Sequence, residues 1–141
     1  LLMIANHDVP PFTGWWQHDD LDIKQQYKLI TCNEYEQLKQ QRIEEQQRLL
    51  RFINHHGNTT ELLLHSEAVT VYSALALCLA GSQSRLFAIQ IDDLDEQKYP
   101  VNIPGTDKEY PNWRRVLTHT SEEIFIKNDT LLAAIDSIRK G

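Results

Sequence analysis

Leu86-Phe-Ala-Ile-Gln-Ile91 is a short, nearly continuous apolar run, and a second run of this kind, Leu1-Leu-Met-Ile-Ala5, opens the chain. Strands with one face in water alternate apolar and polar residues, whereas strands of a parallel sheet are covered on both faces and are apolar throughout. Both runs therefore predict buried strands of a parallel sheet, and the expected fold class is α/β.

The residues between these strands predict helices and loops. Thr13-Gly-Trp-Trp16 is expected to open a short helix. Thr31-Cys-Asn-Glu34 has the spacing of a capping box, which predicts the start of a long Gln- and Glu-rich helix that ends near Gly57. The first half of that helix has only a thin apolar stripe, so we expect it to lie on the surface.

A second, more apolar helix is predicted nearer the second strand. Ser66 is suited to cap a helix over residues 68–80, which is apolar nearly all round and which Gly81 ends. It is expected to be the buried crossover helix between the two strands. After the second strand, Ser121 is expected to begin a short helix, and residues 131–138 have the apolar spacing of a last amphipathic one.

Two strands cannot form a stable parallel sheet alone, because both faces and both edges need cover. The simplest source of the missing strands is the preceding part of a (β/α)8 TIM barrel, of which these are the last two parallel strands. The long connection between them predicts a helical insertion at about residues 17–65. Because the chain has no initiating Met and opens inside an apolar run, residues 1–141 are expected to be a C-terminal portion of a longer protein.

The composition limits the classes of partner. With 41% hydrophobic and 24% charged residues, the chain has the balance of a soluble globular protein, and its net charge of −6 gives no reason to bind nucleic acid or an anionic membrane. The longest apolar run, Ala74 to Ala80, is too short to span a bilayer. Cys32 and Cys78 have neither metal-type nor redox-type spacing, so we expect reduced cysteines and a cytoplasmic location.

The stretch from Tyr99 to Arg115 is too specialised for a simple connection and is expected to face a ligand. Prolines at positions 100, 104 and 111 stiffen it, and Gly105 permits a backbone conformation that other residues avoid. Asn102, Asn112 and Trp113 supply amide groups and an aromatic face. That combination suits a sugar.

Two separated motifs resemble those of one enzyme family. Tyr99-Pro-Val-Asn-Ile-Pro-Gly-Thr106 with Tyr110-Pro-Asn-Trp-Arg-Arg115, and far upstream Ala5-Asn-His-Asp8 with Gly14-Trp-Trp16, are similar to motifs of the amylomaltases, the bacterial 4-alpha-glucanotransferases of the alpha-amylase clan. A weaker resemblance covers nearly all of the chain, although Gln37 to Ser66 carries no motif. It implies a barrel enzyme without a cofactor, which transfers alpha-1,4-glucan segments between maltooligosaccharides by a retaining mechanism.

The resemblance also implies roles for single residues. Asp8 resembles a third carboxylate of the clan, which holds hydroxyls of the reacting sugar and stabilises the positively charged transition state, and His7 is its hydroxyl-binding neighbour. Asn102, Gly105 and Trp113 are expected to bind substrate from the second strand's loop, which leaves the same barrel face as Asp8. From the residues alone, a His–Asp pair is more often structural, Asn102 could cap a turn, and Trp113 could anchor its loop.

A retaining mechanism also needs a nucleophilic carboxylate and a carboxylic acid about 5 Å apart. Asp19-Asp20, Asp92-Asp93 and Glu122-Glu123 are expected to be solvated or to cap helices, and none matches the family's nucleophile or acid motif. Both reagents are therefore expected upstream of Leu1, and this portion alone is expected to be inactive.

The remaining candidates are assigned structural roles. The 6 histidines show no paired helical spacing with a carboxylate, so no metal site is expected. One indole of Trp15-Trp16 is expected to face the core while the other stays near the cleft. Arg114 and Arg115 are expected to pair with loop carboxylates.

Two functions from different classes are kept. The complete protein is expected to be a 4-alpha-glucanotransferase whose partners are maltooligosaccharides and alpha-glucans. The alternative is a non-catalytic glucan-binding or interaction module derived from such an enzyme. The lack of a nucleophilic carboxylate and of a carboxylic acid in this chain favours that alternative. With its sheet edges uncovered, the isolated chain is also expected to self-associate.

Overall fold

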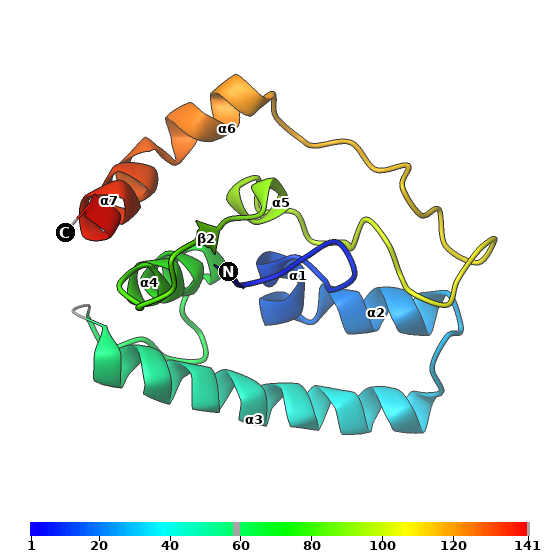
Figure 1. The fold of residues 1–141 in the computed structure, drawn as a ribbon. Helices are drawn as coiled ribbons and strands as arrows, with labels where there is room; N and C mark the ends of the chain where they lie inside the picture. Colours follow the sequence, from blue (N-terminus) through cyan, green and yellow to red (C-terminus); the bar gives the residue numbers. More distant parts are fainter. Residues whose placement is uncertain (58–59, 141) are drawn as a thin grey trace.

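The computed structural model describes residues 1–57 and 60–140 as a mostly helical protein with one short parallel sheet. In chain order the elements are β1 (Leu2–Met3), α1 (Phe12–Gln17), α2 (Asp19–Gln26), α3 (Cys32–His56), α4 (Ala68–Ala80), β2 (Phe87–Ala88), α5 (Ile91–Leu94), α6 (Ser121–Lys127) and α7 (Asp129–Lys140). Figure 1 shows α3 along one side of the molecule and α6 with α7 on the opposite side, joined to α5 by a long irregular segment.

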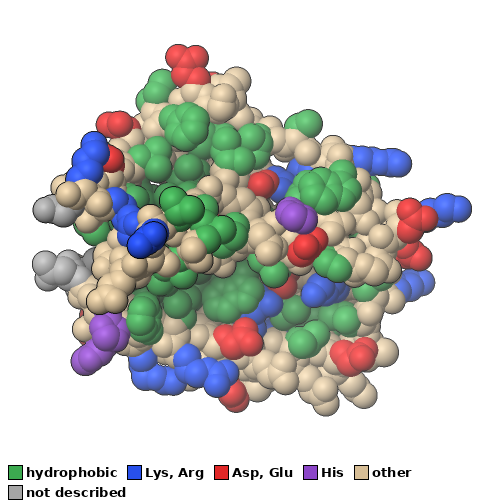
Figure 2. Space-filling model, in the orientation of Figure 1, with side chains coloured by type: hydrophobic (Ala, Val, Ile, Leu, Met, Phe, Trp, Pro, Cys, Tyr) green, Lys and Arg blue, Asp and Glu red, His purple; other side chains and the backbone are tan. Residues whose placement is uncertain are grey.

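The two apolar runs pair in parallel, as predicted, with Leu2 opposite Phe87. The strands are shorter than predicted, 2 residues each, and Ile91 begins α5 instead of ending a strand. Residues 1–57 and 60–140 leave parts of these apolar runs uncovered, since Leu1 is 78% exposed and Leu86 is 65% exposed. Figure 2 shows hydrophobic side chains that reach the surface in patches on one face of the molecule.

The capping box predicted for the long helix is confirmed. The Thr31 hydroxyl accepts a hydrogen bond from the Glu34 backbone N–H, and the Glu34 carboxylate accepts one from the Thr31 N–H. These bonds satisfy free N–H groups at the start of α3, which ends at Gly57 as expected. Thr120 and Glu123 form a second capping box at α6, so the capping role of Glu123 is also confirmed.

The buried helix between the strands is confirmed as α4, with Gly81 after its last residue. Its predicted cap is wrong, since Glu67 occupies the N-cap and the Ser66 hydroxyl accepts a hydrogen bond from the Leu63 N–H instead. The main core gathers apolar side chains of α1, α3, α4, α5 and α6: Phe12, Trp16, Leu50, Ile53, Val71, Tyr72, Leu75, Leu94 and Ile124.

The sequence did not predict α2, and Asp20 on this helix corrects the expectation of a solvated carboxylate. Asp20 is 2% exposed, and its two carboxylate oxygens accept hydrogen bonds of 2.8 and 2.9 Å from Arg42 on α3. Arg42 also donates to the backbone carbonyl of Trp15 at 2.6 Å. The bidentate ion pair therefore fastens α1 and α2 to the long helix.

Loss of Arg42 should strongly destabilise the protein. Arg42→Met keeps most of the side-chain volume but leaves the Asp20 carboxylate buried without its counter-ion, which costs about 3–5 kcal/mol of unfolding free energy. Arg48→Met is the matched control, because Arg48 is exposed on the same helix, and it should change stability by less than about 0.5 kcal/mol. Denaturant unfolding measures both, and equal stabilities for the two variants would contradict the ion pair's role.

Candidate functional site

The first part of the candidate site is the turn that follows β1. Asn6 shapes this turn, because its carbonyl accepts a hydrogen bond from the Val9 N–H at 3.2 Å and its side-chain oxygen accepts one from the Asp8 N–H at 2.9 Å. The side chains of His7 and Asp8 remain 58% and 51% exposed. The turn therefore presents an imidazole and a carboxylate to solvent.

Residues from the loop after β2 meet this turn. Asn102 donates from its side-chain nitrogen to Asp8 Oδ1 at 3.0 Å, although the two residues are 94 positions apart in sequence. His7 Nε2 lies 3.3 Å from Asp8 Oδ2, and the His7 ring lies 5.3 Å from the Trp113 ring, centroid to centroid. The structure thus brings together Asp8, His7, Asn102 and Trp113, which the sequence had linked only through the family resemblance.

The loop that carries Asn102 and Trp113 is held by its own polar groups. Asn112 accepts from the Ile103 N–H at 2.9 Å and donates to the carbonyl and hydroxyl of Thr106 at 3.0 and 2.9 Å. The Tyr110 hydroxyl donates to the Pro100 carbonyl at 2.6 Å. The Asn112 amide is therefore used up inside the loop, in contrast to the sugar-facing role that its motif indicated.

Two residues of this loop have positive φ angles. Gly105 has a φ of 84°, and the space where a Cβ would stand is open, so the backbone conformation and not a close contact requires glycine there. Trp113 has a φ of 60°, which costs energy for a residue with a side chain, and it remains 63% exposed. A strained, exposed indole beside His7 is typical of a ligand-facing position.

Two hollows adjoin Asn102, which lines both. One, of ≈ 310 Å³, is also lined by Asp8, Lys24 and Pro104. The other, of ≈ 840 Å³, is bounded by Tyr27, Trp113 and Arg114. Together the two hollows present a carboxylate, an amide and aromatic faces, which are the groups that bind a polyhydroxylated ligand.

One tryptophan of α1 faces the core, as expected, whereas the other lines a different hollow from the two that Asn102 lines. Trp16 is 6% exposed in the core and donates from its indole nitrogen to the Ser66 carbonyl at 3.0 Å. Trp15 lines a hollow of ≈ 720 Å³ next to Arg42.

The doublet Asp92-Asp93 joins α5 to Arg115 and to the start of α1. Asp92 pairs with Arg115, which confirms that this arginine binds a carboxylate, although the carboxylate lies on a helix and not in the loop. Asp93 is 4% exposed and accepts a hydrogen bond of 2.6 Å from the Phe12 backbone N–H at the start of α1. Asp93 thus caps a helix, which is one of the two roles expected for it, although that helix, α1, lies 81 positions away in the sequence.

Gly14 on α1 explains how closely this helix approaches the loop. A Cβ on Gly14 would lie 1.7 Å from the backbone oxygen of Lys98, just before the loop begins. Only glycine allows this contact, so the Gly-Trp-Trp motif serves to seat the loop as well as to supply indoles.

Among residues 1–57 and 60–140, no three His, Cys, Asp or Glu side chains gather as they would around a metal ion. In the same ranges, no helix combines the length and the apolar character that crossing a membrane requires. Cys32 and Cys78 are both free thiols.

Asp93 should make stability depend on pH. Burial raises its pKa to about 6 from an ordinary value of 3.8. Between these two pH values the folded state keeps a proton that the unfolded state has released, so Asp93 lowers the stability of the fold as the pH rises. Asn at this position still accepts from the Phe12 N–H and carries no charge. Asp93→Asn should therefore raise the melting temperature, relative to wild type, by more at about pH 7.5 than at about pH 4.

Thermal unfolding at both pH values gives this difference. Asp136→Asn is the control, because Asp136 is 59% exposed, and its difference from wild type should change little between the two conditions. A melting-temperature difference for Asp93→Asn that is the same at both pH values would contradict a buried carboxylate with a raised pKa.

Comparisons with known proteins converge on one family. A family model described as 4-alpha-glucanotransferase matches residues 1–120. The 4-alpha-glucanotransferase of Haemophilus influenzae is 28% identical over an alignment that covers 98% of this chain and 20% of the relative. The 4-alpha-glucanotransferases of Mycobacterium bovis and Mycobacterium tuberculosis are each 28% identical over 84% of this chain and 16% of the relative. The chain thus spans about a fifth or less of the length of these relatives.

Proposed function

The chain belongs to the 4-alpha-glucanotransferase family, and we propose that it forms part of an enzyme that transfers alpha-1,4-glucan segments between maltooligosaccharides. The observation that carries this proposal is the contact between the turn after β1 and the loop after β2, where Asn102 donates to Asp8 at 3.0 Å. A carboxylate and an amide that converge beside an exposed indole can hold the hydroxyls and the ring face of one sugar.

In the proposed fold, β1 and β2 are the last two strands of a (β/α)8 barrel. Their parallel pairing and the position of Asp8 and Asn102 after the carboxyl ends of the strands support this arrangement. The helical insertion at about residues 17–65 then comprises α2 and α3. The exposed side chains of Leu1 and Leu86 need cover, from neighbouring strands in the complete protein or from self-association in the isolated chain.

Asp8 is proposed to act on the reacting sugar. In a retaining transfer, positive charge develops at the sugar ring in the transition state, and a fixed carboxylate nearby stabilises that charge more than it stabilises the neutral substrate. His7 lies within 3.3 Å of Asp8 and is proposed to bind an adjacent hydroxyl. The nucleophile and the acid that protonates the leaving oxygen are proposed to lie outside this chain, which is why the chain alone is proposed to be inactive.

The loop is proposed to receive the acceptor glucan. Asn102 lines both hollows of the site, so its amide can bind Asp8 and a sugar hydroxyl in turn. Trp113 offers an exposed ring face for stacking, and Gly105 keeps the loop in the conformation that presents both residues. The proposed reaction uses neither a metal nor a cofactor. A cytoplasmic location is proposed because Cys32 and Cys78 are free thiols.

A non-catalytic glucan-binding module remains the second candidate, because no nucleophile or acid is identified in this chain. The two candidates differ in one measurable property of the full-length protein. A transferase converts maltotriose into longer and shorter oligosaccharides, whereas a binding module retains the sugar unchanged.

Asp8→Asn in the full-length protein should reduce turnover by roughly 10²–10³-fold with little effect on folding, because the substitution keeps the shape and removes the charge that the transition state requires. Disproportionation of maltotriose measures turnover, and circular dichroism checks the fold. Asp136→Asn, which neutralises an exposed carboxylate on α7, is the control with expected wild-type turnover. Near-normal turnover of Asp8→Asn would assign Asp8 a structural role.

Asn102→Ala should impair acceptor use more than donor cleavage, because the amide faces the hollows and not the core. Transfer to added glucose is compared with the rate of donor cleavage. Asn112→Ala is the contrast variant: it removes three hydrogen bonds inside the loop and should lower both rates together with the melting temperature. If Asn102→Ala leaves both rates unchanged but lowers the melting temperature, Asn102 is a structural clamp.

A further inference from the structure

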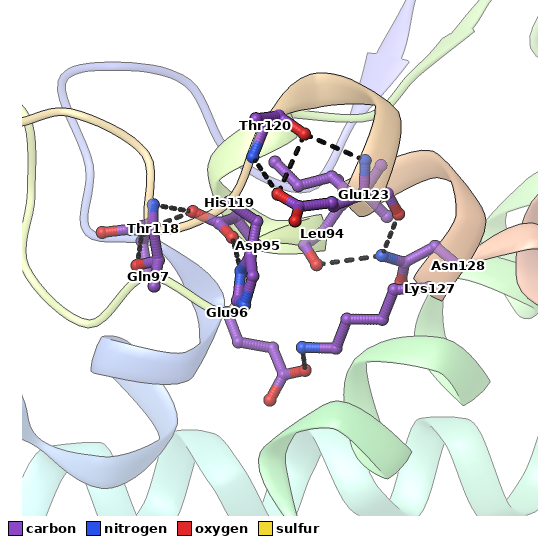
Figure 3. Close-up of polar contacts among 11 residues, drawn as sticks. Leu94, Asp95, Glu96, Gln97, Thr118, His119, Thr120, Glu123, Lys127 and Asn128 are labelled. Atoms are coloured by element: carbon purple, nitrogen blue, oxygen red, sulfur yellow. Dashed lines mark hydrogen bonds and ion pairs between the residues drawn. The ribbon is translucent and has the colours of Figure 1, made fainter.

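Asp95, which follows α5, collects three hydrogen bonds on a carboxylate that is completely buried (Figure 3). Its Oδ2 atom accepts from the Gln97 side-chain nitrogen at 2.5 Å and from the Thr118 backbone N–H at 2.6 Å. Its Oδ1 atom lies 2.7 Å from Nδ1 of His119. No sequence motif marks Asp95.

These three partners stand at the two ends of the loop that carries Asn102 and Trp113. Gln97 lies where the chain enters the loop, and Thr118 with His119 lies where the chain returns. Gln97 also donates to the Thr118 hydroxyl at 2.8 Å, which joins the two ends directly. Asp95 and its partners therefore form a clasp that closes the base of the loop.

The clasp depends on a charged acceptor. Burial works against ionisation of Asp95, yet the hydrogen bonds from His119, Thr118 and Gln97 keep its pKa below the ordinary value. Hydrogen bonds to a carboxylate are stronger than those to a neutral acceptor. His119 is 44% exposed, so its imidazole spans from solvent to this buried charge.

Neighbouring contacts hold the clasp on the helices. Asn128 donates to the carbonyl of Leu94 at 3.0 Å, and Lys127 pairs with Glu96 at 2.5 Å. These contacts join the end of α5 to the end of α6 and to the residue before α7. Both α6 and α7 lie beyond residues 1–120, which the family model matches. These contacts include no bond to Gln97, Thr118 or His119, so a variant that removes one of them is a control for loss of the clasp.

We propose that Asp95 is a positioning residue, which sets the placement of Asn102 and Trp113 for the acceptor glucan by clasping both ends of their loop. This inference rests on the proposed function. Closing a loop at its base limits the positions that its tip can take, and an error of about 1 Å at a reacting group can cost up to 10²-fold in rate. Asp8 belongs to the other segment of the site, so donor cleavage should depend less on the clasp.

The test uses the full-length protein with Asp95→Ala, Asp95→Asn and, as matched control, Lys127→Ala. Hydrogen exchange is measured in peptides that cover residues 99–113, where the amides of Ile103 and Trp113 are hydrogen-bonded inside the loop. Kinetics with maltotriose as donor and glucose as acceptor separate the acceptor KM from the turnover of donor cleavage.

We expect Asp95→Ala to accelerate exchange in the loop and to raise the acceptor KM about tenfold, while donor cleavage changes by less than about threefold. Asp95→Asn should lie between Asp95→Ala and wild type, because it keeps one acceptor oxygen. Lys127→Ala should leave both the loop exchange and the acceptor KM at wild-type values. If Asp95→Ala does not fold, His119→Ala removes one of the three bonds and should shift both measurements in the same direction.

Three results would overturn the proposal. Unchanged exchange in the loop would show that Asp95 does not hold it. Faster exchange with an unchanged acceptor KM would show that the placement of the loop does not affect use of the acceptor. An equal change of exchange and KM in all variants, Lys127→Ala included, would show that Asp95 contributes only to general stability. An inactive wild-type protein would defeat the proposed function and the acceptor role together, whereas the exchange data would still decide whether Asp95 clasps the loop.

Discussion

The hydrogen bond from the Phe12 N–H to the buried Asp93 carboxylate is the interaction on which the arrangement of the site depends. It joins residues 81 positions apart, one in the segment after β1 and the other in the segment after β2. The strands themselves pair over only 2 residues each, which is too little to fix the relative position of the two segments. Together with the close approach of Gly14 to Lys98 and the bond from Asn102 to Asp8, it holds the turn of Asp8 beside the loop of Asn102.

Burial separates two kinds of carboxylate: Asp93 and Asp95, after β2, hold other segments in place, whereas Asp8, in the turn after β1, is open to a ligand in the proposed function. Asp93 and Asp95 are each 4% exposed and accept hydrogen bonds from distant backbone or side chains. Asp8 is half exposed and faces a hollow. Buried charges need such partners to offset the loss of water, and in this protein the partners are the segments that must be held beside the proposed sugar site. The same physical requirement thus stabilises the fold and orients the site.

Local sequence patterns predicted the features that depend on neighbouring residues. The capping box at Thr31, the helix end at Gly57 and the positive φ of Gly105 all follow from interactions within a few positions. The same patterns failed where tertiary contacts decide. Asp20 has the sequence environment of a solvated acid but is buried against Arg42. The Ser66 hydroxyl accepts a hydrogen bond from the Leu63 N–H instead of capping α4. For the site, His7, Asp8, Asn102 and Trp113 came from family motifs. Asp95 belongs to no motif, so only its surroundings reveal it.

A crystal structure of the full-length protein with a bound maltooligosaccharide tests the central claim most directly. We expect a sugar with hydroxyls within hydrogen-bond distance of both Asp8 and Asn102, with its ring against the Trp113 indole and with the Asp93–Phe12 bond intact. A glucan bound elsewhere, with Asn102 still donating to Asp8 as in the free chain, would contradict the proposed sugar site.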